Sequence, residues 1–371
     1  MTQVVRVAFD DQIFEAQARG GYSKLLVELI KRLPNVNIEP VVLPRTTRNL
    51  HLAESGLAVA ESPRKGISAK AAWASWRLVG YPRSQPRVLP AADVMHHTFT
   101  HPSYLRTWSG PRLFTLVDMT PELFPEMFPL GNPHLAKRRY AERSDAIVSI
   151  SQQTAIDMER FYGADLAKKV SVAHLGIGEE FLHPIATTPL VLPDRYVLFV
   201  GVRGGYKDFR TAVAAVGEAV RDAPDVGFVI AGGGALTPAE TTLLAEQGLA
   251  DRAVHVSPPD AQMPQLFRRA SAFLFSSRYE GFGMPTLEAL ASGTPTILAD
   301  ASCAREVGGD VAVYVAPGDA RGFAAALRTI LANGTPDAWR EAAAEHAAQF
   351  TWDAMAKRYA EVYRELADSA R

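Results

Sequence analysis

The chain has 371 residues, 47% of them hydrophobic and 21% charged, and a formal net charge of −1 at pH 7. This length allows two domains with sizeable cores, and the composition is typical of a globular protein. The balanced charge argues against a nucleic-acid-binding protein, which usually carries a concentrated basic surface. A single cysteine, Cys303, excludes an internal disulfide. No apolar run approaches the roughly 18 residues of a membrane span.

The first residues read as a strand, without the charged and apolar regions of a signal peptide. One unpaired cysteine also fits a reducing compartment. These features predict a cytoplasmic protein of two domains, of a size typical of enzymes.

The first segment is expected to form a strand, a glycine turn and a helix. Apart from Arg6, residues 4–9 are apolar; Gly20 and Gly21 follow a loop, and apolar residues then recur at helical spacing from Tyr22 to Leu33. Such a unit begins a parallel α/β sheet, in which ligands bind at the carboxyl ends of the strands. Gly20 and Gly21 form the turn of this unit, and one interpretation of them is a plain tight turn.

The segment between Glu61 and Asp93 contains no acidic residue. Basic and aromatic side chains together suit an interface with anionic lipid, so one hypothesis is that this segment docks the protein beside a lipid-linked acceptor. The alternative is a solvated loop and helix with two core tryptophans. The residues concerned are Arg64, Lys65, Lys70, Arg77, Arg83 and Arg87, interleaved with Trp73, Trp76 and Tyr81.

Two further strands are expected to deliver polar residues to the same sheet edge. Residues 93–99 carry His96 and Thr98 near their end, and Asp118 follows the strand at 112–117. Asp118 is either a residue that hydrogen-bonds ligand hydroxyls or a helix N-cap before Thr120. The nearby histidines have no acidic or cysteine partner at suitable spacing, so no metal site is expected.

The remaining strands and helices alternate through both halves of the chain. A proline-containing stretch at 183–193 reads as a linker between two α/β domains. The other strands are expected at 38–43, 146–151, 170–173, 196–200, 226–231, 253–256, 272–275, 296–298 and 312–315, and the last helix at 352–366.

The strand at 196–200 ends in a glycine-rich loop that contains Arg203 and Lys207. An arginine fork and a lysine point charge suit a nucleotide diphosphate, because cleavage of a sugar–phosphate bond leaves added negative charge on the leaving group. The alternative is a pair of solvated loop cations. The glycines at 232–234 leave room for a nucleotide, and the backbone of Ser257 follows the next strand, where it can read the base.

The most informative stretch is 276–295, SSRYEGFGMPTLEALASGTP. It reads as a strand end, a glycine-rich loop and a helix whose first turn favours an anion such as phosphate. Glu280 and Glu288 flank this turn. A carboxylate beside an anion site is costly unless it binds donors, and sugar hydroxyls are suitable donors.

The pattern from Glu280 to Glu288 around Gly281-Phe282-Gly283-Met284-Pro285 resembles the signature of the retaining nucleotide-sugar glycosyltransferases of family four. The resemblance covers nearly the whole chain and is strongest from 196 to 315. It implies the GT-B fold, two facing doubly wound α/β domains with an interdomain cleft. Residues 1–183 would form the acceptor-side domain, residues 184–351 the donor domain, and the helix in 352–371 would pack back on the first domain.

The resemblance also implies residue roles. Donor contacts are expected at Gly20, Gly21, Gly201, Arg203, Lys207, Ser257, Glu280, Gly281, Phe282, Gly283, Met284, Pro285, Thr286 and Glu288, and acceptor contacts at His96, Thr98 and Asp118. Glu280, Asp118, Arg203 and Lys207 are the expected catalytic residues. Many relatives carry a histidine immediately before this aspartate, but here the position is Val117, so no histidine base is available there.

The implied activity is transfer of a hexose, with retention of configuration, from a nucleotide-diphosphate sugar to a glycan or lipid-linked acceptor. Resemblance to bacterial polysaccharide and O-antigen mannosyltransferases makes GDP-mannose the first expected donor, with UDP-hexoses and dTDP-rhamnose as alternatives. No metal or other cofactor is expected. The protein would act in the cytoplasm, and a peripheral location at the inner membrane face is a further hypothesis. Two other functions remain open, a nucleotide-sugar epimerase or hydrolase and a non-catalytic sugar-nucleotide-binding partner.

Overall fold

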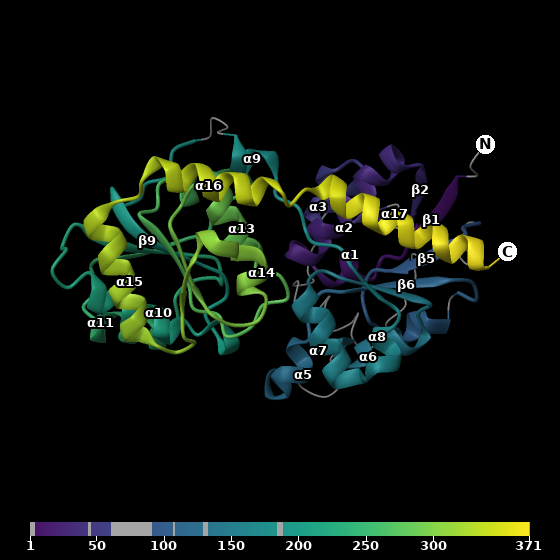
Figure 1. Cartoon of the computed structure of the whole chain (residues 1–371), viewed down its shortest axis with the longest axis horizontal. Coiled ribbons are helices and arrows are strands. Elements are labelled where there is room, and N and C mark those ends of the chain that lie inside the picture. Colours follow the sequence, from purple (N-terminus) through teal and green to yellow (C-terminus); the bar gives the residue numbers. More distant parts are fainter. Residues whose placement is uncertain are drawn as a thin grey trace. The chain divides into compact units, whose positions relative to one another are not determined.

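The computed structural model describes residues 4–43, 46–60, 91–106, 108–128, 133–183 and 188–370. The basic and aromatic segment expected to contact lipid lies, apart from its last residues, outside the described part of the chain. The fold divides into two compact units, unit 1 comprising 1–176 together with 352–371, and unit 2 comprising 177–351 (Figure 1).

Unit 1 is built on a six-stranded, wholly parallel sheet with the order β2-β1-β5-β6-β7-β8. The sheet interior is apolar because its strands are covered on both faces, as parallel sheets require. Its strands are β1 (Val5–Phe9), β2 (Ile38–Val42), β5 (Val94–His97), β6 (Arg112–Leu116), β7 (Ala146–Ser149) and β8 (Val170–Val172).

Helices surround this sheet, and several of them match the apolar periodicity of the sequence. A small parallel pair, β3 (Thr46–Thr47) and β4 (Val59–Ala60), lies apart from the main sheet. The helices are α1 (Gln12–Ala16), α2 (Gly21–Arg32), α3 (Leu50–Glu54), α5 (Thr120–Leu123), α6 (Lys137–Arg143), α7 (Gln152–Tyr162), α8 (Ala164–Ala167) and α17 (Trp352–Ser369). Helix α1 occupies residues that the sequence suggested were loop.

Unit 2 repeats the architecture with the strand order β11-β10-β9-β12-β13-β14, again all parallel. Its strands are β9 (Arg195–Val200), β10 (Val226–Ala231), β11 (Ala253–Val256), β12 (Ala272–Phe275), β13 (Thr296–Ala299) and β14 (Val313–Val315). Each lies within two residues of its expected position, because an uninterrupted apolar run is the signature of a strand buried on both faces.

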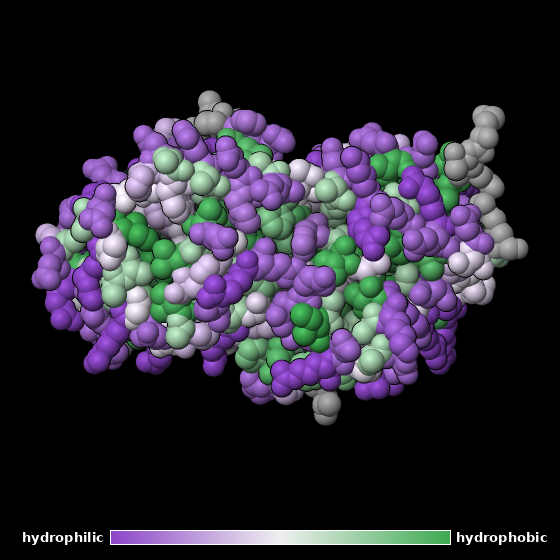
Figure 2. Space-filling view, viewed as in Figure 1, coloured by the Kyte–Doolittle hydropathy of each residue, from purple (hydrophilic) through white to green (hydrophobic). Residues whose placement is uncertain are grey.

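The helices of unit 2 pack in pairs, α10 with α15 and α13 with α16. They are α9 (Glu179–Leu182), α10 (Phe209–Ala219), α11 (Pro238–Glu246), α12 (Met263–Arg268), α13 (Met284–Ala291), α14 (Ala304–Gly308), α15 (Ala320–Asn333) and α16 (Asp337–Ala348). None of the described helices is both long and apolar enough to cross a membrane. On the face shown in Figure 2 the surface is mainly hydrophilic, with hydrophobic residues in small groups.

The boundary between the units falls earlier than the linker composition suggested. Residues 177–183 belong to unit 2, whereas the expected boundary placed them in the first domain. The Arg268 guanidinium donates to the carbonyls of Glu180 at 3.0 Å and Phe181 at 2.6 Å, and the Phe181 ring packs on Phe267. These contacts fix α9 to unit 2 before the proline-containing stretch begins.

Helix α17 closes unit 1, to which it returns after the whole of unit 2 (Figure 1). It packs on α2, β1, β5 and β7. Tyr363 and Tyr359 lie on its buried face, where the Tyr363 hydroxyl is 2.6 Å from His96 Nδ1 and the Tyr359 hydroxyl is 2.8 Å from Thr115 Oγ1. Thr115 Oγ1 is also 2.8 Å from His96 Nε2.

His96 is therefore a core residue and not an acceptor contact. Its side chain is fully buried and both ring nitrogens have partners in unit 1. Burial lowers the pKa of His96 from 6.5 to about 3, with the charge of His97 adding to the shift and that of Asp10 opposing it. The structure does not place His96 toward a ligand, because α17 covers the face of the sheet on which His96 lies and Tyr363 pairs with its Nδ1.

We predict that neutral His96 makes unit 1 sensitive to acid. Below about pH 6.5 the unfolded chain binds a proton at this residue and the folded chain does not, so the free energy of unfolding falls as the pH drops towards 3. The slope contributed by one such proton is at most about 1.4 kcal/mol per pH unit.

Urea unfolding at about pH 7.5 and about pH 5, on either side of the ordinary histidine pKa, measures this effect. The variant His96→Gln should be less stable at neutral pH because it loses the bonds to Tyr363 and Thr115, but its stability should change less between the two pH values. An equal pH-dependent loss in both proteins would contradict the assignment.

Candidate active site

The strand order of unit 2 places its switch point between β9 and β12, the neighbouring strands from which the chain winds in opposite directions. Ligands of open α/β sheets bind beyond the carboxyl ends of the strands at such a point. Lys207 follows β9 and Glu280 follows β12, so these two residues flank the switch point.

An ion pair joins Lys207 to Glu280. The Lys207 Nζ lies 2.6 Å from Glu280 Oε1, and the exposed fractions of the two side chains are 13% and 17%. The ammonium group also lies 5.3 Å from the ring centroids of both Tyr206 and Phe275. A lysine desolvated in this way interacts more strongly with its carboxylate than an exposed pair does.

Backbone contacts fix the two loops that carry this pair. The Ser276 hydroxyl is within hydrogen-bond distance of the carbonyls of Lys207 at 3.0 Å and Asp208 at 2.9 Å, and the Arg278 amide donates to the Tyr206 carbonyl. Asp208 adopts a left-handed conformation with φ of 50°. The position of Lys207 is therefore set by the strand end at 276–278 as well as by its own loop.

A third loop, which follows β13, reaches the same carboxylate residue. The Ser302 hydroxyl donates to the Glu280 carbonyl at 2.7 Å, and the Cys303 thiol donates to the same oxygen at 3.2 Å. Burial raises the pKa of Cys303 well above its usual value, and the charges of Glu280 and Glu306 add to this shift. Cys303 is thus a buried, protonated thiol that supports the loop and is no nucleophile.

Arg203 lies in the glycine-rich loop after β9, but its guanidinium is fully engaged within unit 2. Its Nε donates to Glu240 at 2.8 Å, and its terminal nitrogens donate to the carbonyls of residues 232–235 at 2.5 to 3.2 Å. Only 3% of the side chain is exposed. Burial alone would raise the pKa of Glu240, but hydrogen bonds from Arg203 and Thr237 outweigh it and the net pKa is lowered.

Arg203 therefore organises the triple-glycine loop in this structure. A diphosphate contact by Arg203 stays a prediction, and it requires exchange of some of these bonds for bonds to phosphate. Gly201, at the start of the same loop, has a φ of 134°, which strongly favours glycine. Ser257 is exposed just after β11, on the same edge of the sheet.

The glycine-rich loop after β12 leads into α13 as the sequence predicted. Gly283 caps the helix in the left-handed conformation, with φ of 82°. Met284, Pro285 and Glu288 on this helix are partly exposed, whereas Thr286 is buried. Pro285 has no N–H, and the Thr286 N–H donates to the Gly283 carbonyl at 2.9 Å. The first turn thus offers an anion fewer donors than an ordinary helix N-terminus.

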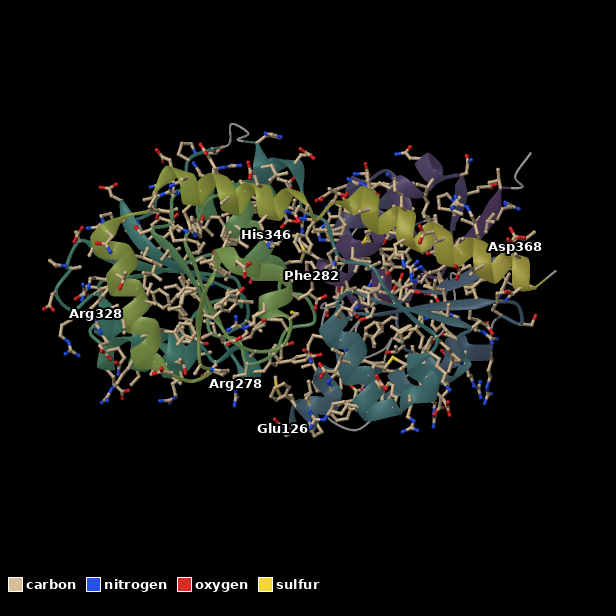
Figure 3. The ribbon with its side chains drawn as sticks, in the orientation of Figure 1. Glu126, Arg278, Phe282, Arg328, His346 and Asp368 are labelled. Carbon is tan, nitrogen blue, oxygen red and sulfur yellow. The ribbon has the colours of Figure 1, made fainter. Side chains whose placement is uncertain are left out.

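Phe282 differs from its expected role as a donor contact. Its side chain is buried, and its ring centroid lies 5.9 Å from that of Phe350, which is 5.6 Å from His346 of α16. Figure 3 shows the labelled Phe282 and His346 on the α13–α16 side of unit 2. The phenyl ring therefore anchors the loop from within unit 2, while the preceding Gly281 is partly exposed.

At the switch point of unit 1, between β1 and β5, a buried carboxylate organises the strand ends. Asp10 accepts from Thr98 Oγ1 at 2.6 Å and from Gln12 Nε2 at 2.7 Å, and it lies 2.8 Å from His97 Nδ1. Burial alone would raise the pKa of Asp10, but the hydrogen bonds and charge of His97, with those of Thr98 and Gln12, lower it overall.

Thr98 is consequently a structural residue, and its expected contact with the acceptor is wrong. Its side chain is fully buried and its hydroxyl oxygen also accepts the Ile13 N–H, which starts α1. Gly20 and Gly21 follow at the amino end of α2, where Gly20 has an extended backbone with φ of 177° and neither glycine is left-handed. A Cβ at Gly20 would meet Gln17 Oε1 at 2.3 Å, whereas a Cβ at Gly21 would meet open space.

Asp118 follows β6 and stays a ligand-binding candidate, with 29% of its side chain exposed. Its Oδ1 accepts the Thr120 N–H at 3.1 Å, so the N-cap-like alternative also describes it. Burial raises its pKa, but the charges of Lys137 and then His134 outweigh burial and lower the pKa overall. The ionised carboxylate can only accept hydrogen bonds, for example from sugar hydroxyls.

Lys137 connects Asp118 to a second carboxylate. Its Nζ donates to the Asp118 carbonyl at 2.7 Å and to Glu122 Oε2 at 3.0 Å, and only 3% of its side chain is exposed. The Tyr162 hydroxyl also donates to Glu122. In the described part of the chain, no three His, Cys, Asp or Glu residues are grouped so as to hold a metal ion.

Sequence reasoning missed several of these residues. Glu240 could have been noticed as the fourth residue of the capping box Thr237-Pro-Ala-Glu240, but nothing in the pattern pairs it with Arg203. Ser276, Ser302 and Lys137 act through backbone carbonyls or buried carboxylates brought together by the fold, and no spacing rule identifies such contacts.

Comparison with known proteins shows which class the chain resembles. Residues 194–333, all within unit 2, match the family model described as glycosyl transferases group 1. Relatives that match most of the chain are also glycosyltransferases, and similar solved structures share its two-sheet architecture. The matched part of unit 2 and the relatives of the whole chain are thus similar to glycosyltransferases, and the chain has the GT-B fold.

Individual relatives fall within this class. The chain is 36% identical to the O-antigen chain mannosyltransferase B of Escherichia coli over 99 residues, 26% of this chain and 25% of that protein. It is 27% identical to the D-inositol 3-phosphate glycosyltransferase of Streptomyces coelicolor over 95% of this chain and 88% of that one. It covers 56% of the length of the Mycobacterium tuberculosis glycogen synthase that it also matches.

A similar solved structure is that of Anabaena HepE in complex with UDP and glucose. The TM-score is 0.69 and the sequence identity 17%, over 97% of this chain and all of that one. At this identity the likeness establishes the fold.

We predict that Gly233→Ala destabilises unit 2 more than Gly234→Ala does. Both glycines have a φ of 75°, so both variants lose about 1–2 kcal/mol from a left-handed alanine. A Cβ at Gly233 would also lie 2.7 Å from Arg203 Nη1 and 3.1 Å from the Gly201 carbonyl, whereas none of the described atoms lies within 4 Å of one at Gly234.

The difference between the two variants therefore isolates the Arg203 contact. Thermal unfolding of each measures it, and we expect the midpoint of Gly233→Ala to be the lower. Equal midpoints would show that Arg203 does not hold the loop closely.

Proposed function

We propose that this protein transfers a hexose from a nucleotide-diphosphate sugar to a glycan or lipid-linked acceptor with retention of configuration. The observation that carries this proposal is the Lys207–Glu280 pair at the switch point of unit 2. A cation beside a carboxylate at this place suits a donor whose diphosphate needs positive charge and whose sugar hydroxyls need an acceptor.

Each group has a part in the proposed reaction. Lys207 neutralises the diphosphate, Glu280 accepts hydrogen bonds from the transferred sugar, and Glu288 accepts them from the ribose. The bond between the anomeric carbon and the phosphate oxygen breaks, and the acceptor oxygen bonds to the same carbon from the same face. The leaving phosphate takes the proton of the acceptor hydroxyl, so no protein nucleophile is needed. The resemblance to retaining enzymes supports this mechanism of attack from the same face.

The ion pair implies a cost for donor binding. Lys207 and Glu280 must exchange their mutual contact for contacts with diphosphate and sugar. A donor with both groups satisfies both residues, whereas a free nucleotide leaves Glu280 without its partner. We therefore expect the affinity of the intact donor to exceed that of its nucleoside diphosphate. This difference should be larger here than at a site with a single unpaired cation.

For the donor, GDP-mannose is our first candidate. The name of the Escherichia coli relative supports mannosyl transfer, and the Anabaena structure, which contains UDP and glucose, supports a UDP-hexose as the alternative. We assign acceptor recognition to Asp118, whose ionised, partly exposed carboxylate suits hydroxyl binding.

A thermal-shift panel of GDP, UDP, dTDP and ADP sugars without acceptor tests the proposal, with the products identified by mass spectrometry. Stabilisation by one base class and an intact donor afterwards would support a transferase that awaits its acceptor. Consumption of the donor alone would favour an epimerase or hydrolase. No shift with any nucleotide would favour a non-catalytic partner protein.

We predict that Lys207→Ala lowers the rate of sugar transfer at least about 100-fold, the scale of losing one charge-stabilising donor. It should also abolish the thermal shift by the preferred nucleotide sugar. The control is Arg321→Ala, which removes an exposed cation of α15, a helix more than 100 residues after this loop in the sequence. Near-normal turnover of Lys207→Ala would refute the diphosphate assignment.

We further propose that the segment from Glu61 to Asp93 brings the protein to an anionic membrane surface, where a lipid-linked acceptor would reside. Its excess of arginine, lysine and tryptophan supports this proposal. We predict greater co-sedimentation with vesicles that contain phosphatidylglycerol than with phosphatidylcholine vesicles, in a manner weakened by salt. Equal recovery with both would contradict it.

A further inference from the structure

A surface pocket of unit 1 is lined by three arginines that the proposed reaction does not use. It has a volume of about 350 Å³ and lies between the short 3₁₀ helix Pro102–Arg106 and α6. Its lining consists of Pro102, Ser103, Leu105, Arg106, Arg139 and Arg143. The volume lies at the lower end of the range for small-molecule sites.

The three arginines have no counter-ion in the part of the chain that the structure describes. No described carboxylate pairs with Arg106, Arg139 or Arg143, and none lines the pocket. Neighbouring cations on the same helix behave differently. Arg138 pairs with Glu142 at 2.9 Å, and Lys137 with Glu122 at 3.0 Å.

This arrangement does not serve the stability of unit 1. Arg139 and Arg143 are four residues apart on α6 and share one face of the helix, where like charges repel. Arg106 adds a third positive charge from another segment. The repulsion is relieved when an anion binds between the guanidinium groups, so the pocket is suited to a ligand with negative charge.

The walls of the pocket are held by buried hydrogen bonds. The Tyr140 hydroxyl of α6 donates to the His101 carbonyl at 2.6 Å, directly before the 3₁₀ helix, and the Tyr104 hydroxyl donates to Asp11 at 2.8 Å. Both tyrosines are fully buried. The backbones that carry Arg106, Arg139 and Arg143 are therefore fixed relative to one another within unit 1.

The pocket is separate from the candidate active site. Lys137, at the start of α6, turns inward to Asp118, whereas Arg139 and Arg143 are exposed. Arg143 lies six residues after Lys137 on this helix, which corresponds to about 9 Å at the usual rise per residue. The lining has no aromatic side chain on which a nucleotide base could stack, so a nucleotide is a poor fit.

We propose that this pocket binds a phosphate ester, with the phosphate held by the forks of Arg106, Arg139 and Arg143. Planar guanidinium groups bind phosphate oxygens in pairs, which gives both charge and geometry. The phosphate is carried by a small soluble ester or by a phospholipid headgroup, which share this chemistry. This site goes beyond the proposed transfer reaction and does not depend on it.

Modification of arginines by phenylglyoxal in the full-length protein, mapped by mass spectrometry of peptides, tests the proposal residue by residue. The probes are inorganic phosphate at constant ionic strength and, separately, phosphatidylglycerol vesicles with phosphatidylcholine vesicles as their control. We expect a common saturable decrease in rate at the three arginines, about tenfold when phosphate is about ten times its Kd. Arg160, an exposed arginine of α7, is the internal reference.

The outcomes distinguish the two sources of phosphate. Protection by inorganic phosphate shows that a free phosphate suffices, and protection by the anionic vesicles alone shows that the headgroup is the ligand. No protection by either probe, or protection equal to that of Arg160, would overturn the proposal.

A pair of variants separates binding from a structural role. In Arg139→Gln/Arg143→Gln, protection of Arg106 should disappear, while the midpoint of thermal unfolding should stay the same or rise because repulsion is removed. Arg138→Gln changes the charge of the same helix outside the pocket and should leave the protection of Arg106 intact. Loss of protection in both variants, or its persistence in the double variant, would contradict the assignment.

Discussion

The ion pair between Lys207 and Glu280 is the interaction on which the candidate active site of unit 2 depends. It crosses from the loop after β9 to the loop after β12, and the loop after β13 joins them through Ser302 and Cys303. Each of these strands ends at the same edge, because the sheet is wholly parallel. Three loops far apart in the sequence are thereby fixed around two charges, and the free energy to hold them comes from the apolar strands beneath.

The second organising element, Arg203, works with its neighbours in a different way. Its guanidinium donates to successive carbonyls of the triple-glycine loop, which compensates for the missing secondary structure there. Glu240 neutralises it from α11. Arg203 and Lys207 are thus paired with carboxylates within unit 2. The arginines of the three-arginine pocket in unit 1 have no such partner among the described residues. Charged residues that pair with one another hold the loops of a site in place. Charged residues without a partner attract a ligand of opposite charge.

The sequence predicted both main sheets and nearly every strand, because buried parallel strands are uninterrupted apolar runs that need no tertiary information. The motif from Glu280 to Glu288 was likewise readable from spacing alone. The directions of individual side chains could not be predicted from spacing. His96 and Thr98 are polar residues at a strand end, but they turn to the Tyr359–Tyr363 face of α17 and to Asp10. Phe282 turns inward to Phe350. Such side-chain directions depend on contacts between residues that are distant in the sequence, as does the early end of unit 1 set by Arg268.

The return of α17 to unit 1 has a consequence for the order of folding during synthesis. The ribosome makes the strands of the first sheet early, but the helix that covers β1 and β5 emerges only after the 175 residues from 177 to 351. At about 5–20 residues per second that interval is roughly 10–35 seconds. Throughout it, His96 lacks Tyr363 and the apolar face beneath α17 is bare. The nascent chain must therefore stay in solution with an incomplete first core while the second folds, which makes this interval the period in which a chaperone has most to protect.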